Sequence, residues 1–250
     1  MLCCVTTELP KVRRIAGQSI RDEKERLKDN RFLPVFLTCF VAWMLWGWEV
    51  TKAHTHQPPQ PTAVFCVAIV TTGVCAVVFG RLLGRFRNLN RGERGEMRVA
   101  EVLDELRGAG YQVVHGIVGA GFDVDHVIVG PAGVFAIETK FRSGFGEIEF
   151  RNGEGLFVAG RKEAKDPIVQ ARGNAAHVAG LIKETCRINQ WVKPIVVFVG
   201  DWKIKNKWQA TDARVFTTDG LLGYIEGQQP ELTRGEIKLI ASHLDRPTRS

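Results

Sequence analysis

The most chemically distinctive part of this sequence is the stretch 121–141, in which acidic residues and a lysine interrupt an apolar run. Its charged residues are Asp123, Asp125, Glu138 and Lys140. Two carboxylates are hard oxygen ligands suited to magnesium, which keeps several waters and contacts substrate phosphates. A lysine beside such a cation would orient the attacking water or stabilise the charge that develops on phosphorus. These residue types indicate metal-assisted phosphodiester hydrolysis.

The same stretch has the pattern of a β-hairpin, because two runs of β-branched and aromatic residues are separated by Gly-Pro-Ala-Gly at 130–133. Side chains alternate along a strand, so Asp123 and Asp125 share one face of the first strand. Glu138 and Lys140 likewise share one face of the second. Strand interiors disfavour charged residues unless these have partners or a bound cation. The hairpin therefore predicts a site, and a purely structural ion pair between Glu138 and Lys140 is the alternative.

The spacing of these residues carries a resemblance. Asp125 followed by Glu138-Thr139-Lys140 resembles the Asp…(Asp/Glu)-x-Lys signature of the restriction-endonuclease-like superfamily. A wider set of segments resembles the nuclease-related domain, NERD. These segments are Gly95-Glu96 opening a helix, Asp123-Val124-Asp125-His126-Val127, Gly130-Pro131-Ala132-Gly133-Val134-Phe135, Ile137-Glu138-Thr139-Lys140, and Asp166-Pro167-Ile168-Val169-Gln170 with its Pro-x-x-Gln. Together they cover residues 94–222.

The resemblance implies an α/β fold with a mixed β-sheet flanked by helices, as in restriction endonucleases, and the activity of a phosphodiester hydrolase. The site residues it implies are Asp125, Glu138, Lys140 and Gln170 for catalysis, with Asp125, Glu138, Glu96 and Asp123 as ligands of Mg²⁺ or Mn²⁺. Within that set, Gln170 would aim its amide at the site. A second interpretation of Glu96 is that it complements the helix dipole in the first turn of a helix, and both interpretations stay open.

Two apolar segments precede this region, at 32–48 and 62–80, and neither contains a charged residue. Each is close to the ~20 residues that cross the core of a bilayer. Trp43, Trp46 and Trp48 stand toward the end of the first segment, where amphipathic rings favour the membrane interface. The pattern predicts a two-helix transmembrane hairpin. A buried helical hairpin in a soluble protein is the alternative, although neither segment has the polar stripe of a surface helix.

The distribution of charge separates the two halves of the chain. The net charge of +7 arises entirely before Gly95, and the remainder of the chain is neutral. Arginines and lysines flank the outer ends of the apolar segments and largely avoid the loop between them, which predicts that both termini and the catalytic domain are cytoplasmic in a multi-pass protein of the cell membrane. The basic pI is therefore no indication of nucleic-acid binding.

The predicted organisation follows from these segments. It comprises a basic N-terminal segment at 1–31, a transmembrane hairpin at 32–80, a basic juxtamembrane linker at 81–94, a nuclease-related domain at 95–225, and a C-terminal helix and tail at 226–250. The elements predicted beside the central hairpin are a helix at 95–106, a strand at 111–118, a second hairpin at 146–150 and 155–158, a helix from Asp166-Pro167 to about 185, a buried strand at 194–200, a short strand at 215–216 and a capped helix at 233–244.

Several surface features allow two interpretations. Five basic residues around the second hairpin could contact phosphate or merely charge an exposed strand edge: Arg142, Arg151, Arg161, Lys162 and Lys165. The run 201–208, with two tryptophans among lysines, could stack bases or form an exposed loop. His126 and His177 are interpreted as structural histidines, with metal or catalytic roles as the alternative.

Together these features predict a membrane-anchored, metal-dependent nuclease acting on DNA, with RNA as the other candidate substrate. The rival is a non-catalytic, membrane-tethered module that binds nucleic acid or protein with the nuclease fold. A neutral domain favours the rival, because nucleases usually carry a basic footprint. The intact acidic residues and lysine favour the enzyme, because buried charge is costly to retain without a role.

Overall fold

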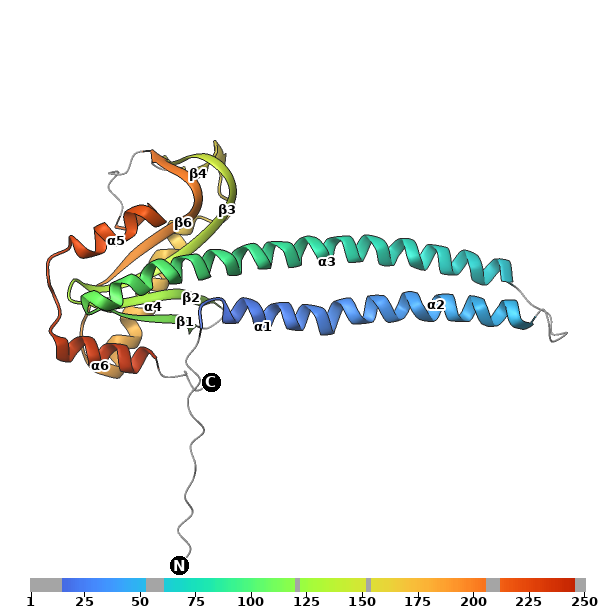
Figure 1. Cartoon of the computed structure of the whole chain (residues 1–250), viewed down its shortest axis with the longest axis horizontal. Helices are drawn as coiled ribbons and strands as arrows, with labels where there is room; N and C mark the ends of the chain where they lie inside the picture. Colours follow the sequence, from blue (N-terminus) through green and yellow to red (C-terminus); the bar gives the residue numbers. More distant parts are fainter. Residues whose placement is uncertain (1–14, 53–60, 120–121, 152–153, 206–211, 246–250) are drawn as a thin grey trace, which may run out of the picture. The chain divides into compact units, whose positions relative to one another are not determined.

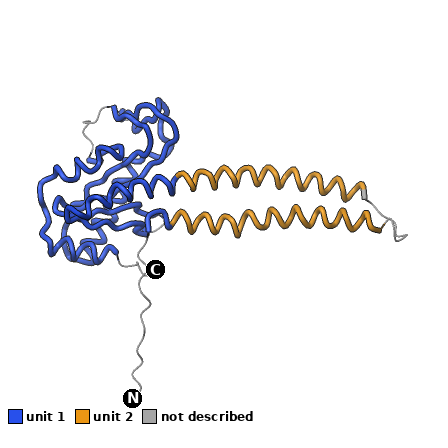
Figure 2. The backbone as a smooth tube through the Cα atoms, in the orientation of Figure 1, with its two compact units in different colours: residues 1–18, 92–250 blue, residues 19–91 orange. Residues whose placement is uncertain are grey.

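The structure, a computed structural model, describes residues 15–52, 61–119, 122–151, 154–205 and 212–245. The chain divides into two compact units, residues 19–91 and residues 1–18 with 92–250 (Figure 2). The helices are α1 (Gln18–Leu27), a π-helical turn (Lys28–Phe32), α2 (Leu33–Lys52), α3 (Pro61–Asp104), a 3-10 segment (Glu105–Ala109), α4 (Pro167–Cys186), α5 (Thr218–Glu226) and α6 (Arg234–Leu244). The strands are β1 (Gln112–Val118), β2 (Asp123–Gly130), β3 (Gly133–Arg151), β4 (Gly155–Val158), β5 (Arg161–Lys162), β6 (Val192–Lys205) and β7 (Arg214–Thr217) (Figure 1).

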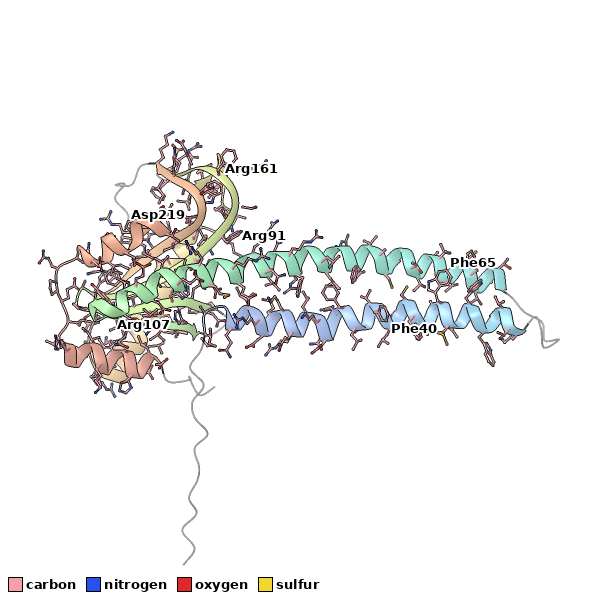
Figure 3. The ribbon with its side chains drawn as sticks, viewed as in Figure 1. Phe40, Phe65, Arg91, Arg107, Arg161 and Asp219 are labelled. Atoms are coloured by element: carbon pink, nitrogen blue, oxygen red, sulfur yellow. The ribbon has the colours of Figure 1, made fainter. Side chains whose placement is uncertain are left out.

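The unit at 19–91 is helical, and its apolar side chains face outward. Two helical stretches, Gln18–Lys52 and Thr62–Ala109, are long and apolar enough to cross a membrane. Side chains such as Phe40 and Phe65 project from the helices (Figure 3) and are 53% and 40% exposed. The interpretation of these segments as a buried core hairpin is disfavoured, since almost none of the residues in the two apolar windows is buried.

Contacts within this unit join its helices at several levels. Near one end, Phe32 and Phe79 meet edge to face with 5.3 Å between ring centroids. Farther along, the indole Nε1 of Trp43 donates to Thr72 Oγ1 over 2.9 Å. Lys24 Nζ donates to Asn90 Oδ1 over 2.9 Å. Side chains from different helices of this unit are thus joined by both aromatic contacts and hydrogen bonds.

The predicted start of a helix at Gly95 is wrong. α3 runs without interruption from Pro61 to Asp104, so residues 81–94, predicted as a linker, are helical. Glycine costs a helix only about 1 kcal/mol, and no proline occurs between Arg81 and Asp104 to end it. The predicted end of this helix near residue 106 is confirmed. α3 ends at Asp104, and the 3-10 segment that follows it is capped by Gly110, which has the left-handed conformation with φ +86°.

The unit that contains residues 92–250 is built on a mixed seven-stranded sheet, as predicted from the sequence. β2 pairs with β1 on one side and with β3 on the other, both antiparallel, and His126 stands opposite Ile137. β3 also pairs in parallel with β6, with Glu138 opposite Val196. β7 extends the sheet by pairing in parallel with β6. β4 pairs with the far half of β3, and β5 pairs with β4, both antiparallel. β3 is therefore the strand to which three others are hydrogen-bonded.

Two predicted strands are longer than the sequence indicated. The residues predicted as the first strand of a second hairpin, 146–150, belong to β3 itself, which continues through an irregularity between Phe141 and Phe145. The predicted buried strand at 194–200 extends to Lys205 and takes in part of the tryptophan-lysine run. Trp202 is buried and donates its Nε1 to Arg142 O over 3.1 Å, so it cannot serve as an exposed stacking ring. Residues 206–208 of that run, and the turn at 152–153, lie outside the described residues.

Helices cover both faces of the sheet. On one face, α4 and α6 pack Val178 and Ile240 against strand residues such as Val127. On the other face, the end of α3 and α5 pack Leu103 and Leu221 against the opposite side of the same strands. α5 was not predicted. The caps of α4 and α6 are confirmed, with Asp166 accepting from Ile168 N and a capping box joining Thr233 and Glu236.

The packing of the hairpin turn yields a first prediction. A Cβ at Gly130 would lie 1.8 Å from the Tyr111 ring, so Gly130→Ala must displace that ring from the core. We expect the free energy of unfolding to fall by about 1–3 kcal/mol, as overpacking in cores typically costs. Urea unfolding of the detergent-solubilised chain measures this. Gly173→Ala, on an open face of α4, is the matched control and should be neutral or stabilising.

Candidate active site

The site begins where α3 approaches the sheet beside Glu96. Gly95 makes this approach possible, because a Cβ at this position would lie 2.9 Å from Phe141 Cβ on β3. Glu96 stands deep within α3, more than eight turns from Pro61 by ~3.6 residues per turn. The favourable effect of a helix dipole is confined to the first turn. The dipole interpretation of Glu96 is therefore wrong, and its carboxylate interacts with the acidic residues of β2 and β3 instead.

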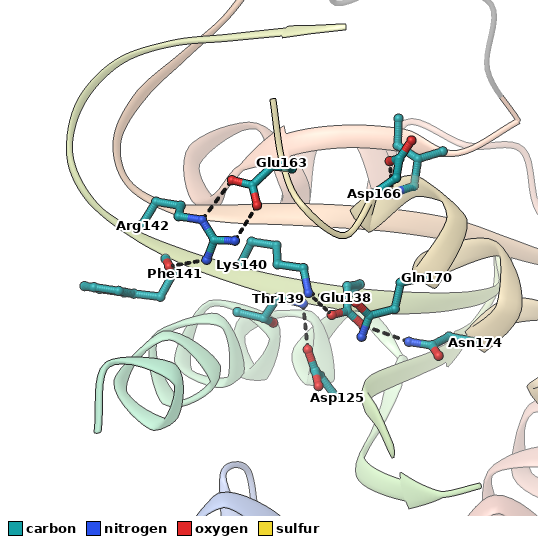
Figure 4. Close-up of polar contacts among 11 residues, drawn as sticks. Asp125, Glu138, Thr139, Lys140, Phe141, Arg142, Glu163, Asp166, Gln170 and Asn174 are labelled. Atoms are coloured by element: carbon teal, nitrogen blue, oxygen red, sulfur yellow. Dashed lines mark hydrogen bonds and ion pairs between the residues drawn. The ribbon is translucent and has the colours of Figure 1, made fainter. Parts of the chain in front are cut away.

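β2 and β3 bring the next two carboxylates together. The register that places His126 opposite Ile137 places Asp125 beside Glu138 at the adjoining position, on one face of the sheet. Asp125 Oδ2 accepts a hydrogen bond of 2.7 Å from the backbone N–H of Thr139 (Figure 4). Asp123 lies two residues earlier on the same strand, and its charge acts on Glu96. The predicted acidic set is thus gathered from three elements.

Lys140 is the centre of the polar contacts in Figure 4. Its Nζ donates to Glu138 Oε1 over 2.5 Å and to Gln170 Oε1 over 2.9 Å. Glu138 and Lys140 share a face of β3, as predicted, and Gln170 reaches them from the first turn of α4. The Lys140 side chain is 17% exposed, whereas that of Glu138 is 3% exposed. The lysine is therefore the member of this pair that solvent can reach.

Asn174, to which the sequence pattern assigned no role, completes the environment of Glu138. Asn174 is 2% exposed, and its Nδ2 donates to Glu138 Oε2 over 2.8 Å. It stands one helical turn after Gln170 on α4, so both amides face β3. The spacing of four between Gln170 and Asn174 was the signal that could have identified it. Both oxygens of Glu138 are therefore held by protein donors.

Burial and mutual repulsion disturb the acidity of this cluster. Burial raises the pKa of Asp125 well above its ordinary value, and the charges of Glu138 and Glu96 raise it further, while Thr139 N–H and Lys140 oppose this. Burial also raises the pKa of Glu138, against the lowering effects of Lys140 and Asn174. The pKa of Glu96 is raised from 4.5 to about 7, mainly by burial. The hydrogen bond from Gly17 N–H lowers this pKa, whereas the charges of Glu138 and Asp123 raise it. The cluster therefore favours fewer negative charges than the same carboxyl groups would carry in water.

The two histidines take structural positions. His126 is fully buried, and its Nδ1 lies 2.8 Å from Nδ1 of His115 on the neighbouring strand. Burial, with a smaller effect of His115, lowers the pKa of His126 to about 3, so this ring is neutral at physiological pH. The ring of His177 packs edge to face on Phe122 at 5.0 Å. Strand alternation puts His126 on the opposite face from Asp125.

The basic residues near the second hairpin are partly occupied by ion pairs. Arg142 makes a bidentate contact with Glu163, at 2.9 Å from Nε and 2.6 Å from Nη2 (Figure 4). That contact is the first cause of the raised pKa of Arg142. Arg151 pairs with Glu149 on its own strand. Both arginines therefore serve the structure of the β3 region, which weakens the interpretation of this cluster as a free phosphate-binding surface.

The ligand types in this cluster, though not their present arrangement, suit a hard divalent cation. Asp125, Glu138 and Glu96 are three desolvated carboxylates that repel one another, and excess carboxylate oxygen is what Mg²⁺ and Mn²⁺ prefer. Among the described residues, no three His, Cys, Asp or Glu side chains are already arranged around a common point. Glu138 is held by Lys140 and Asn174 instead. Binding of a cation would therefore require these side chains to rearrange. The charge of the cation would then replace part of the interaction between Lys140 and Glu138.

Comparison with known families agrees with this geometry. Residues 91–199 match the family model of the nuclease-related domain, NERD. This match spans α3 from Arg91 through the core of β6 and includes Glu96, Asp125 and Lys140. Searches among curated proteins and among solved structures returned no match. The resemblance stated from the motifs is thereby confirmed, and the domain has a nuclease-like fold.

The acidic cluster predicts an unusual dependence of stability on pH. Folding raises the pKa of Glu96 to about 7, so the folded state binds more protons than the unfolded state between pH 4.5 and 7. Stability is then greatest below pH 4.5 with respect to this group and is lost as pH rises through 7. In the parent protein, this group should lower the free energy of unfolding by about 2–3 kcal/mol as the pH rises, and Glu96→Gln should remove that decrease. Urea unfolding from pH 5 to 8 in EDTA measures this. An identical pH profile for the variant and the parent protein would contradict the assignment.

Proposed function

We propose that the nuclease-related domain at residues 91–199 belongs to a membrane-anchored, metal-dependent nuclease that hydrolyses phosphodiester bonds in DNA, with RNA as the alternative substrate. The observation that carries the proposal is the desolvated cluster of Asp125, Glu138 and Glu96 around Lys140. A purely structural role gives no reason to gather these carboxylates, since acidic groups that are withdrawn from water and placed together cost stability. Such a cost is typical of functional sites.

In this proposal Asp125 and Glu138 hold Mg²⁺ or Mn²⁺, with Glu96 and Asp123 as further oxygen ligands. When bound, the cation polarises a phosphoryl oxygen and lowers the pKa of a bound water. The carboxylates supply the negative charge that keeps the cation in a site also visited by polyanionic substrate. Thr139 N–H fixes Asp125 through a 2.7 Å hydrogen bond, which turns the carboxylate toward Glu138 rather than solvent.

Lys140 is the residue that acts on the substrate. An ammonium has three N–H donors, and Glu138 and Gln170 accept two of them. The third N–H is available for the attacking water or for a phosphoryl oxygen. In hydrolysis, the attacking water gives up a proton as its oxygen bonds to phosphorus, the bond from phosphorus to the leaving oxygen breaks, and the leaving oxygen takes up a proton. Lys140 would stabilise the negative charge that builds on the phosphoryl oxygens during this step.

Gln170 and Asn174 are positioning residues in this proposal. Each reaches from the same face of α4, where Asp166 caps the helix and Pro167 begins it. Gln170 holds Lys140, and Asn174 holds Glu138, so neither charged side chain can turn away from the cluster. The amides carry no charge and leave the balance between the carboxylates and the lysine unchanged.

The same proposal anchors the domain to the cell membrane. Two stretches are long and apolar enough to cross a bilayer, and large apolar side chains such as Phe36 and Trp48 are more than half exposed. Exposed apolar surface of this extent needs a nonpolar environment. Arginines and lysines flank the outer ends of the two apolar segments, which favours a cytoplasmic location for both termini and the domain.

A second candidate function is a non-catalytic, membrane-tethered module that binds nucleic acid or protein. The observation that favours it is the complete internal satisfaction of Glu138, whose two oxygens accept from Lys140 and Asn174. A structural ion pair would have this same appearance. The two functions differ in whether the carboxylates take up a cation, and this difference can be measured.

The first prediction from the nuclease proposal concerns Lys140. Lys140→Ala removes the ammonium that faces the substrate, so the rate of DNA cleavage in Mg²⁺ should fall at least about 10²-fold, as for other charge-stabilising groups. Cleavage is followed on a fluorescently labelled DNA duplex and single strand, and on RNA. Circular dichroism and the unfolding midpoint show whether the variant keeps its fold.

Lys183→Ala is the matched control, because Lys183 is exposed near the end of the same helix that carries Gln170. It should cleave like the parent protein. Undiminished cleavage by Lys140→Ala would remove this residue from the mechanism, and with it the assignment of the site.

The second prediction concerns the cation. Mn²⁺ titrated calorimetrically into the full-length protein should bind, and the double variant Asp125→Asn/Glu138→Gln should lose most of this binding, because two charged ligands become neutral. The titration is repeated with DNA present, since phosphate oxygens can complete the coordination. A parent protein that binds no Mn²⁺ under either condition would favour the binding module instead.

A further inference from the structure

A short turn ahead of α1 reaches the carboxylate of Glu96. The backbone N–H of Gly17 donates to Glu96 Oε2 over 3.0 Å, although the two residues are 79 positions apart. Ala16 is 5% exposed, and Gly17 is buried with it. The turn closes on itself, because Gln18 N donates to Ile15 O over 3.1 Å and Ile15 N donates to Gln18 Oε1 over 3.3 Å. The amide of Gly17 is thus held in a defined direction.

Glycine is required at this position for two separate reasons. Its φ of +75° lies in the left-handed region, which side chains disfavour. A Cβ at Gly17 would also lie 3.0 Å from Glu93 Cγ, one turn before Glu96 on α3. A substitution must therefore either move the turn away from α3 or displace Glu93. Both movements would shift the Gly17 N–H relative to the Glu96 carboxylate.

We propose that Gly17 is a positioning residue of the site, whose amide holds Glu96 in the orientation in which its carboxylate joins Asp125 and Glu138. This inference rests on the proposed metal-dependent function. Glu138, Asp123 and Glu93 all repel Glu96. The Gly17 N–H opposes that repulsion with a hydrogen bond to an ionised acceptor, which is stronger than one between neutral groups. It thus keeps Glu96 in the cluster before any cation arrives.

The bond leaves Glu96 able to serve as a ligand. A carboxylate has two oxygens and about four lone-pair positions, so accepting one amide does not exhaust it. Hydrogen bonds from outside the coordination sphere commonly orient metal ligands in this way. The segment ahead of the apolar helices therefore contributes to the site, and the chain must return to the same side of the membrane to place Gly17 beside Glu96.

The experiment measures Mn²⁺ affinity of the full-length protein in detergent, by electron paramagnetic resonance of the free ion. Gly17→Ala should weaken binding about tenfold, as loss of an outer contact to a ligand does. In the background of Glu96→Ala, the same change should have no further effect, because the group through which Gly17 acts is gone. An equal loss in both backgrounds, or no loss in the first, overturns the proposal.

Gly160→Ala is the control for backbone strain. Gly160 has a φ of +74°, close to that of Gly17, but a Cβ there meets no atom within 4 Å. It should leave Mn²⁺ affinity unchanged. A loss equal to that of Gly17→Ala would attribute the effect to general destabilisation and overturn the positioning role.

A readout without metal separates this inference from the proposed function. Hydrogen exchange at the Gly17 amide in EDTA should be slow in the parent protein and faster in Glu96→Ala, as expected when its acceptor is removed. Unprotected exchange in the parent protein overturns the contact itself. If the parent protein binds Mn²⁺ through Asp125 while Gly17→Ala is silent, only the positioning role fails. If the parent protein binds no Mn²⁺, the metal assignment fails, and the positioning role fails with it.

Discussion

The crowding of desolvated carboxylates beside Lys140 is the constraint around which the domain is arranged. Burial is the main cause that raises the pKa of Asp125, Glu138 and Glu96, and the charge of Glu138 raises the pKa of Asp125 and of Glu96 further. Each is held by a donor that the fold supplies: Thr139 N–H, Lys140 with Asn174, and Gly17 N–H. These donors come from separate parts of the chain. The acidic groups can stay close together only if the backbone that carries these donors is rigid.

That rigidity comes from β3, which is bonded along its length to β2, β4 and β6. Glu138 lies in the buried part of β3, whereas most residues of β3 beyond Phe141 are half-buried or exposed. On one face α4 brings Gln170 and Asn174 to the strand, and on the other α3 packs closely because Gly95 has no side chain to keep it away. Helices on both faces thus fix the side chains that single strands could not hold.

The continuity of α3 connects the apolar half of the chain to this site. The helix that passes through the apolar segment is the same helix that carries Glu96, without a loop between them. Residues 95–250 are neutral overall, so this part of the chain exerts little long-range attraction on polyanions.

The sequence by itself determined the mixed α/β fold, the hairpin, the caps of α4 and α6, and the pairing of Glu138 with Lys140, since all of these depend on local periodicity, turn residues and strand alternation. It did not determine where α3 begins, because glycines weaken a helix without ending it, nor that β3 continues through its irregularity. The spacing of Asn174 from Gln170 indicated only that the two share a face of α4, and nothing in the sequence pattern assigned a role to Gly17. Their roles arise from contacts across 36 and 79 positions, and only the tertiary structure, by packing α4 and the turn before α1 against the same carboxylates, decides which distant donors meet which acceptors.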